Sequence, residues 1–157
     1  MDSVYLGLGA NLGDKQKQLM TAITLLTERV GNIFMLSGFY ETESWGYQSA
    51  YSFLNMAVHL ETSLSPHELL VVTQQIECAL GRTAKRKNQC YIDRTIDIDI
   101  LLYDTMILHT PDLVLPHPLM HKRLFVLQPL LEIAPGLIHP VFHKTVTELY
   151  QGLLSDS

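Results

Sequence analysis

The stretch DRTIDIDIL, residues 93–101, carries the alternation that decides the fold of this chain. Its isoleucines share one face of the predicted strand 95–103, while Asp97 and Asp99 share the opposite face. The isoleucine face requires a hydrophobic core. A carboxylate is costly to bury unless a positive group or a metal ion pairs with it. We therefore expect the acidic face to meet a cation, or a ligand that carries one.

Strands and helices alternate on the N-terminal side of this strand. The predicted order is a strand at 3–9, a helix from Asp14 to Val30, strands at 33–42 and 53–61, a helix that begins after Ser65, and the strand at 95–103. This β-α-β-β-α-β order is typical of the ferredoxin-like fold, an α/β (α+β sandwich) class with a mainly antiparallel sheet. Further C-terminal helices are predicted near 121–132 and 144–153.

In a ferredoxin-like fold both crossover helices cover one face of the sheet. The apolar positions of the strands 53–61 and 95–103 belong on that face. Phe53 and Asn55 then share the other face with Asp97 and Asp99, where a ligand or the C-terminal helices have room to lie. The pattern places an aromatic ring and an amide beside a pair of carboxylates.

The composition is that of a single globular domain, 1–157. Hydrophobic residues make up 47% of the chain and charged residues 17%, which excludes a disordered protein. The formal net charge of −5 argues against general nucleic-acid binding. The two cysteines, Cys78 and Cys90, form no CxxC motif and indicate reduced thiols. No signal peptide and no membrane span is visible, so we expect a cytoplasmic monomer that binds no membrane.

Two carboxylates that lie two residues apart on a strand can share one or two magnesium ions, together with the phosphates of a substrate. Basic and histidine residues flank the pair: Arg82, Lys85, Arg86, Lys87 and Arg94 precede it, and His117, Lys122 and Arg123 follow it. An acidic pair surrounded by guanidinium groups is typical of a triphosphate site. The alternative is a solvated strand face, on which alternating aspartates are harmless.

The stretch GLGANLGD, residues 7–14, does not have the spacing of a nucleotide-binding glycine loop. We interpret it as a tight turn from strand to helix. No serine or cysteine has the surroundings of a covalent nucleophile. The aromatic residues Trp45, Phe53, Tyr91 and Phe125 lie in or beside the segments already singled out. Such rings could hold a flat aromatic substrate between them.

Six stretches together resemble the family of 6-hydroxymethyl-7,8-dihydropterin pyrophosphokinases, which are enzymes of folate biosynthesis. The stretches are GLGANLGD, FYETE, FLNMAV, QQIECALGR, DRTIDIDILLY and LPHPLMHKRLFVLQPLLEIAP, and they extend over nearly the whole chain. The core from Arg94 to Asp99 is highly specific when PHP, an arginine and a phenylalanine follow it. The family has a ferredoxin-like fold, which agrees with the predicted order of elements.

The resemblance implies transfer of pyrophosphate from ATP to the hydroxymethyl group of the pterin, with release of AMP. Asp97 and Asp99 would bind two magnesium ions. The phosphates would be bound by Arg82, Arg94, His117 and Arg123, and the nucleotide by Gln74, Glu77, Arg86 and Ile100. The pterin would contact Thr42, Trp45, Phe53, Asn55, Tyr91 and Phe125, with an aromatic ring on each side of it.

Two rival functions account for parts of the pattern. A ferredoxin-like module that binds a ligand without catalysis would release no AMP, and it gives no reason for Arg94, His117 and Arg123 to accompany the acidic pair. A metal-dependent nucleotidyl transferase or nuclease also uses a DxD motif. The net charge of −5 disfavours the nucleic-acid groove that such an enzyme needs.

Overall fold

The computed structural model describes residues 1–43, 52–81, 83–86, 89–92 and 96–156, with the backbone alone described at 43, 83–86 and 89–92. The main sheet has the strand order β2-β4-β1-β7, and β3 also pairs with β4. Its strands are β1 (Asp2–Ala10), β2 (Gly31–Leu36), β3 (Tyr40–Glu43), β4 (Ser52–Thr62) and β7 (Ile96–Tyr103). All of the pairings are antiparallel. The ferredoxin-like α/β fold with a mainly antiparallel sheet, predicted from the sequence, is confirmed.

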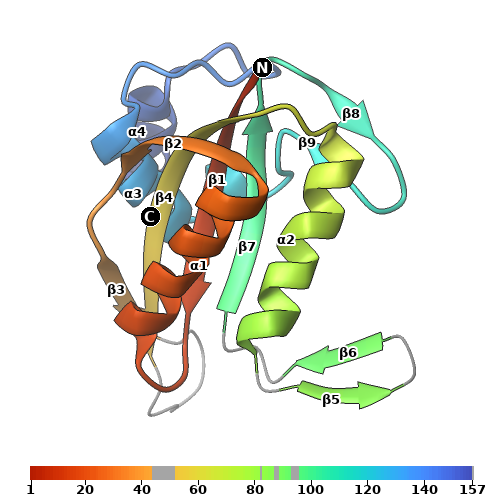
Figure 1. Ribbon diagram of the computed structural model, residues 1–157. Coiled ribbons are helices and arrows are strands. Elements are labelled where there is room, and N and C mark those ends of the chain that lie inside the picture. The colour runs from red at the N-terminus through yellow and green to blue at the C-terminus, as the bar shows by residue number, and fades with distance from the viewer. Residues whose placement is uncertain (44–51, 82, 87–88, 93–95, 157) are drawn as a thin grey trace.

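Helices cover both faces of this sheet (Figure 1). The helices α1 (Lys15–Arg29) and α2 (Pro66–Leu80) lie on one face, and α3 (Leu124–Ile133) and α4 (Val146–Ser155) lie on the other. Shorter elements complete the described chain: β5 (Thr83–Arg86), β6 (Gln89–Ile92), β8 (Leu108–His109), β9 (Val114–Leu115) and the 3-10 turn η1 (Met120–Lys122). The β5–β6 hairpin lies beyond the C-terminal end of α2 (Figure 1).

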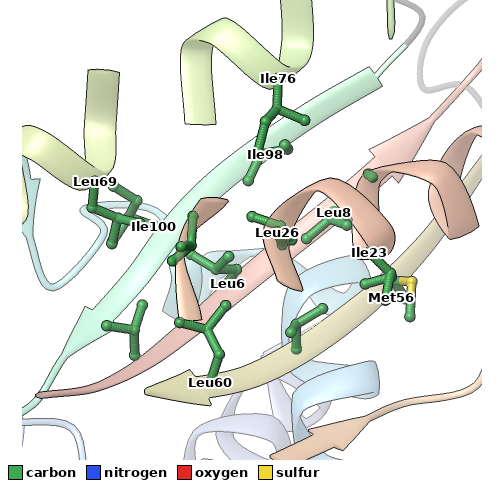
Figure 2. Close-up of a cluster of buried hydrophobic side chains, with 14 of the residues drawn as sticks. Leu6, Leu8, Ile23, Leu26, Met56, Leu60, Leu69, Ile76, Ile98 and Ile100 are labelled. Atoms are coloured by element: carbon green, nitrogen blue, oxygen red, sulfur yellow. The ribbon is translucent and has the colours of Figure 1, made fainter. Parts of the chain in front are cut away.

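The larger hydrophobic core lies between the sheet and the two crossover helices. Figure 2 shows Ile98 and Ile100 of β7 packed beside Leu69 and Ile76 of α2, and all four side chains are buried. Because side chains alternate along a strand, burying these isoleucines directs Asp97 and Asp99 to the opposite face. A second core, built on Ala57, packs α3 and α4 against that opposite face.

The helix ends follow the capping signals of the sequence. Asp14 accepts a hydrogen bond from the amide of Lys17, and Ser65 forms a capping box with Glu68. α2 ends at Gly81, whose amide donates to the carbonyl oxygen of Glu77. The two crossover helices are therefore predictable from local chemistry at their ends and from their apolar stripes.

The predicted strand 33–42 is wrong as a single element, because the structure divides it into β2 and β3. Ser37 lies at the break. Its backbone amide donates to the carbonyl oxygen of Ala57 at 3.0 Å, and its hydroxyl accepts from the amide of Ala57 at 2.8 Å. A side-chain oxygen thus takes the place of a strand carbonyl, and the ladder with β4 is interrupted there until β3 resumes it at Tyr40.

The secondary structure and one cysteine differ from the sequence-based expectations. The basic segment after α2 contains the β5–β6 hairpin rather than a plain loop, and the helix predicted near 121–132 is divided into η1 and α3. Cys78 on α2 is disulfide-bonded, so the expectation of a reduced thiol is wrong there. Within the described ranges, no helix combines the length and the apolar character that crossing a bilayer requires.

The entry to β2 offers a test of the close packing of the sheet. A Cβ atom on Gly31 would lie 1.9 Å from the backbone oxygen of Glu61, which cannot move without disturbing β4. We expect Gly31→Ala to lower the free energy of unfolding by at least about 2 kcal/mol. The matched control is Gly152→Ala in α4, where nothing lies within 4 Å, and this change should stabilise the protein by about 0.5–1 kcal/mol. Urea unfolding measures both, and equal stabilities would contradict the packing.

Candidate active site

A row of three residues crosses the centre of the sheet on the face opposite the larger core. Asn55 of β4 pairs with Gly9 of β1, and Gly9 pairs with Asp97 of β7. Directly paired residues of an antiparallel sheet point to the same face, and adjacent strands lie about 4.8 Å apart. The amide of Asn55 and the carboxylate of Asp97 therefore flank a central strand position that has no side chain.

The second carboxylate of the pair lies one row along the sheet. Asp99 pairs with Gly7 as Asp97 pairs with Gly9, and both carboxylates are partly exposed. Two neighbouring carboxylates with room for water and substrate oxygens suit magnesium, which commonly takes one or two protein carboxylates. In the described part of the chain no group of three or more histidine, cysteine or acidic side chains could hold a metal ion. Carboxylate oxygens are ligands that suit a hard cation.

The glycines of GLGANLGD are divided between the predicted first strand and the turn that follows it. Gly7 and Gly9 lie inside β1, and Gly13 alone has the positive φ of a turn glycine, at 69°. A Cβ atom on Gly9 would lie 3.0 Å from Oδ1 of Asn55, whereas one on Gly7 would meet only the side chain of Leu101 at ordinary distance, 3.5 Å. Gly9 is therefore a candidate site residue that the sequence analysis did not identify, although its position in a strand next to a turn could have indicated it.

His117 is held beside β7 by its own backbone. Its amide donates to the carbonyl oxygen of Leu101 at 2.9 Å, and its ring Nδ1 accepts from the amide of Leu119 at 3.1 Å. Burial lowers the pKa of His117, and Arg123 lowers it further, while the nearby Asp99 opposes the shift. The neutral ring therefore carries its proton on Nε2, which is available as a hydrogen-bond donor.

Arg123 and Phe125 enter the site from the start of α3. Arg123 is the N-cap residue of that helix, and its guanidinium carbon lies 5.4 Å from the centre of the Phe125 ring. Phe125 is 38% exposed. An exposed aromatic ring beside an arginine can contact a flat ligand with one face while the arginine meets an anion.

Asn55 is oriented by a hydrogen bond on its own face of the sheet. It is only 4% exposed, and its Nδ2 donates to Oγ1 of Thr42 at 3.0 Å. Thr42 pairs with Phe53 across the β3–β4 ladder. The structure thus brings together three predicted pterin contacts, and it leaves Oδ1 of Asn55 directed toward Gly9 as an acceptor.

A contact that the sequence analysis missed joins α3 to β3. Oε1 of Glu132 accepts from the hydroxyl of Tyr40 at 2.7 Å and from the amide of Gly38 at 3.0 Å. These bonds lower the pKa of Glu132, and they raise the pKa of Tyr40 to about 12. Since α3 carries Phe125 and β3 carries Thr42, Glu132 links the supports of two predicted pterin contacts. No residue spacing in the sequence predicts the contact of Glu132 with Tyr40 and Gly38.

The predicted nucleotide contacts are divided between the two faces of β7. Gln74 is exposed on α2, and Oε2 of Glu77 accepts from the backbone amide of Ile98 at 2.6 Å. Ile100 is buried in the core at 4% exposure, so its side chain cannot meet a nucleotide, and only its backbone could do so. The predicted residues Trp45, Arg82 and Arg94, and the side chains of Arg86 and Tyr91, lie outside the described part.

The fold defines a class of protein, the ferredoxin-like α/β sandwich, and one face of its sheet carries two partly exposed carboxylates near a histidine. The comparisons with known proteins make the assignment specific. Residues 5–135 match the model of the 7,8-dihydro-6-hydroxymethylpterin-pyrophosphokinase (HPPK) family. The chain belongs to this family.

Two relatives agree with the family assignment. The chain is 50% identical over 141 residues to the 2-amino-4-hydroxy-6-hydroxymethyldihydropteridine pyrophosphokinase of Porphyromonas gingivalis, covering 89% of this chain and 95% of the relative. It is 42% identical over 148 residues to the enzyme of the same name in Aquifex aeolicus, covering 94% and 90%. The chain therefore has the activity of its family, pyrophosphoryl transfer from ATP to hydroxymethyldihydropterin in folate biosynthesis.

Solved structures show the same fold at low sequence identity. An HPPK-DHPS chain crystallised with substrates superposes with a TM-score of 0.75 at 18% identity, covering 99% of this chain. A Plasmodium falciparum HPPK-DHPS gives a TM-score of 0.78, also at 18% identity, over 98% of this chain. The chain spans 44% and 46% of the lengths of these two solved chains.

The link from Glu132 to Tyr40 predicts a pH-dependent contribution to stability. The pKa of Glu132 is depressed in the folded state, so its contribution is complete above the ordinary pKa of about 4.5 and is lost as the pH falls through the lower folded value. At neutral pH we expect Glu132→Ala to cost about 0.5–1 kcal/mol, a modest value because the group is exposed. The difference from wild type should shrink toward pH 3.

Urea unfolding of the wild type and of Glu132→Ala at several pH values measures this difference. Glu148→Ala is not a suitable control, because Glu148 belongs to the capping box of α4. Tyr40→Phe is the informative partner, because it removes one of the two bonds and should cost less than Glu132→Ala. A stability difference that does not change with pH would contradict the assignment.

Proposed function

We propose that the reaction is magnesium-dependent and that Asp97 and Asp99 together hold two magnesium ions. The row from Asn55 through Gly9 to Asp97 is the observation that carries this proposal. This row supports a binding position for the pterin over Gly9, with the hydroxymethyl group of the pterin directed toward Asp97 and Asp99. Bound there, magnesium would neutralise phosphate charge and lower the pKa of the attacking hydroxyl.

The reaction joins the hydroxymethyl oxygen of the pterin to the β-phosphorus of ATP. The bond from that phosphorus to the oxygen that bridges it to the α-phosphate breaks, AMP leaves with this oxygen, and the hydroxyl proton is released. Such a transfer depends on alignment and on charge stabilisation, and it needs no covalent nucleophile from the protein. This requirement agrees with a sequence in which no nucleophile motif is present.

The phosphates are bound in this proposal by Arg82, Arg94, His117 and Arg123. The neutral His117 ring supports this role, because its Nδ1 already accepts from Leu119 and its Nε2 is left to donate to a phosphate oxygen. Arg123 supports it by its closeness to His117, whose pKa it lowers. Gln74, Arg86 and the backbone of Ile100 are assigned to the nucleotide, while the carboxylate of Glu77, which was predicted beside them, is engaged with the amide of Ile98.

The pterin is held between aromatic rings, with Phe125 on one side and Tyr91 on the other. Oδ1 of Asn55 accepts from a ring N–H group, an assignment supported by the engagement of Nδ2 with Thr42. Trp45, Thr42 and Phe53 complete the wall of the pterin site. In this proposal, selectivity for the pterin has two sources. The side-chain amide of Asn55 forms a hydrogen bond with the polar edge of the pterin, and the flat space above Gly9 admits a planar ring.

We also propose that the single domain 1–157 acts as a cytoplasmic monomer without nucleic-acid or membrane partners. The net charge of −5 supports the exclusion of nucleic acid. Sedimentation of the purified chain tests the monomer.

The magnesium proposal is tested by AMP release from ATP and 6-hydroxymethyl-7,8-dihydropterin, with mass detection of the pterin diphosphate. We expect activity with magnesium and none after chelation. Asp99→Asn keeps the size of the side chain and removes its charge, and we expect it to lower kcat at least about 100-fold. The control is Asp156→Asn in the exposed end of α4. Near-normal activity of Asp99→Asn would contradict the assignment of Asp99 as a metal ligand. Release of AMP without pterin diphosphate would indicate hydrolysis of ATP in place of pyrophosphate transfer.

The bare position at Gly9 gives a second test with a built-in control. A methyl group on Gly9 would stand beside Oδ1 of Asn55 where the pterin is placed, while one on Gly7 meets only Leu101. We expect Gly9→Ala to raise KM for the pterin at least about tenfold while KM for ATP changes little. Gly7→Ala should leave both near the wild-type values. Equal effects of the two variants on pterin KM would contradict the placement.

A further inference from the structure

The acidic pair lies on a strand at the edge of the main sheet. β7 pairs with β1, and it has no second strand beside it in the described chain. Asp97 and Asp99 pair directly with Gly9 and Gly7 of β1. The backbone amide of Ile98, between them, is directed away from β1 and needs another acceptor.

Glu77 supplies that acceptor from the helix above the strand. Its Oε2 lies 2.6 Å from the amide nitrogen of Ile98, a short contact of the kind that a charged acceptor favours. The helix itself is held in place, since the side chain of Ile76 packs beside that of Ile98 in the core (Figure 2). The carboxylate therefore reaches the edge of β7 from a rigid support.

The position of this bond matters because β7 is not regular throughout. Its pairing with β1 shifts register between Tyr5 and Leu6, just beyond the pair formed by Leu6 and Ile100. A slip of one residue along an edge strand would turn an aspartate from the ligand face toward the core. The carboxylate of Glu77 is a fixed acceptor for the amide of Ile98, the residue between the two aspartates. This hydrogen bond therefore opposes a slip of β7.

We infer that Glu77 is a positioning residue, whose carboxylate fixes the edge of β7 at Ile98 and so holds Asp97 and Asp99 in the geometry that binds magnesium and the triphosphate. This inference rests on the proposed role of the two aspartates. It gives Glu77 a function through the strand, distinct from direct contact with the nucleotide. Partners that hold metal ligands in place commonly change metal affinity by 10–100-fold when they are removed.

The choice of variants separates a positioning role from a direct charge effect. Glu77→Gln keeps the reach of the side chain and a carbonyl oxygen that accepts from Ile98, but it removes the charge. Glu77→Asp keeps the charge, but it is one methylene shorter and cannot span the same distance. If Glu77 positions the strand, glutamine substitutes well and aspartate poorly. If its charge acts on the nucleotide or on the cation, the order is reversed.

The first measurement is hydrogen exchange at the amide of Ile98, which requires no substrate. We expect slow exchange in the wild type and in Glu77→Gln, and exchange at least about tenfold faster in Glu77→Asp and Glu77→Ala. The control is Gln75→Ala, an exposed polar position on the same helix, which should leave this amide protected. If Glu77→Ala does not fold, the Gln and Asp variants still decide the question.

The second measurement is the magnesium concentration that gives half-maximal AMP release. We expect it to rise about 10–100-fold in Glu77→Asp and to stay within about threefold of wild type in Glu77→Gln. Loss of magnesium affinity in Glu77→Gln, or unchanged exchange at Ile98 in Glu77→Asp, would overturn the inference. Altered exchange together with magnesium-independent activity in the wild type would instead overturn the proposed magnesium site and leave the strand contact standing.

Discussion

The site depends on the alternation of side chains along one edge strand, β7. Its isoleucines are buried against α2, and this burial fixes which face the intervening aspartates occupy. The free energy of burying three branched side chains thus determines the direction of two carboxylates. No separate interaction has to turn Asp97 and Asp99 toward the ligand face, because the core does so from the other side of the same strand.

A second constraint is the absence of a side chain on the central strand. Gly9 lies between Asn55 and Asp97 in adjacent strands, so the sheet itself forms a floor with polar groups at its two sides. A flat ring can approach the backbone there as closely as van der Waals contact allows. A β-sheet usually presents a continuous layer of side chains, and the glycine opens this layer at the position where the pterin is proposed to bind.

The two C-terminal helices complete the second core, and one of them, α3, also carries residues of the proposed site. They cover the part of the ligand face that carries Ala57, and α3 brings Arg123 and Phe125 to the uncovered part. Glu132 at the other end of α3 joins the helix to the strand that carries Thr42. One helix therefore spans the face from the phosphate side to the pterin side, so the two halves of the proposed site share a support.

The sequence by itself determined the crossover helices, the inner strands and the paired carboxylates, because caps and side-chain periodicity are local properties. It did not predict the break at Ser37, the value of Gly9 as an open floor, or the bonds of Glu132 and Glu77. Each of these depends on which distant segment becomes a neighbour: Ser37 meets Ala57, Gly9 meets Asn55, and Glu77 meets Ile98. Only the tertiary structure decides such pairs, since hydrogen bonds and close approaches between remote residues leave no period in the chain.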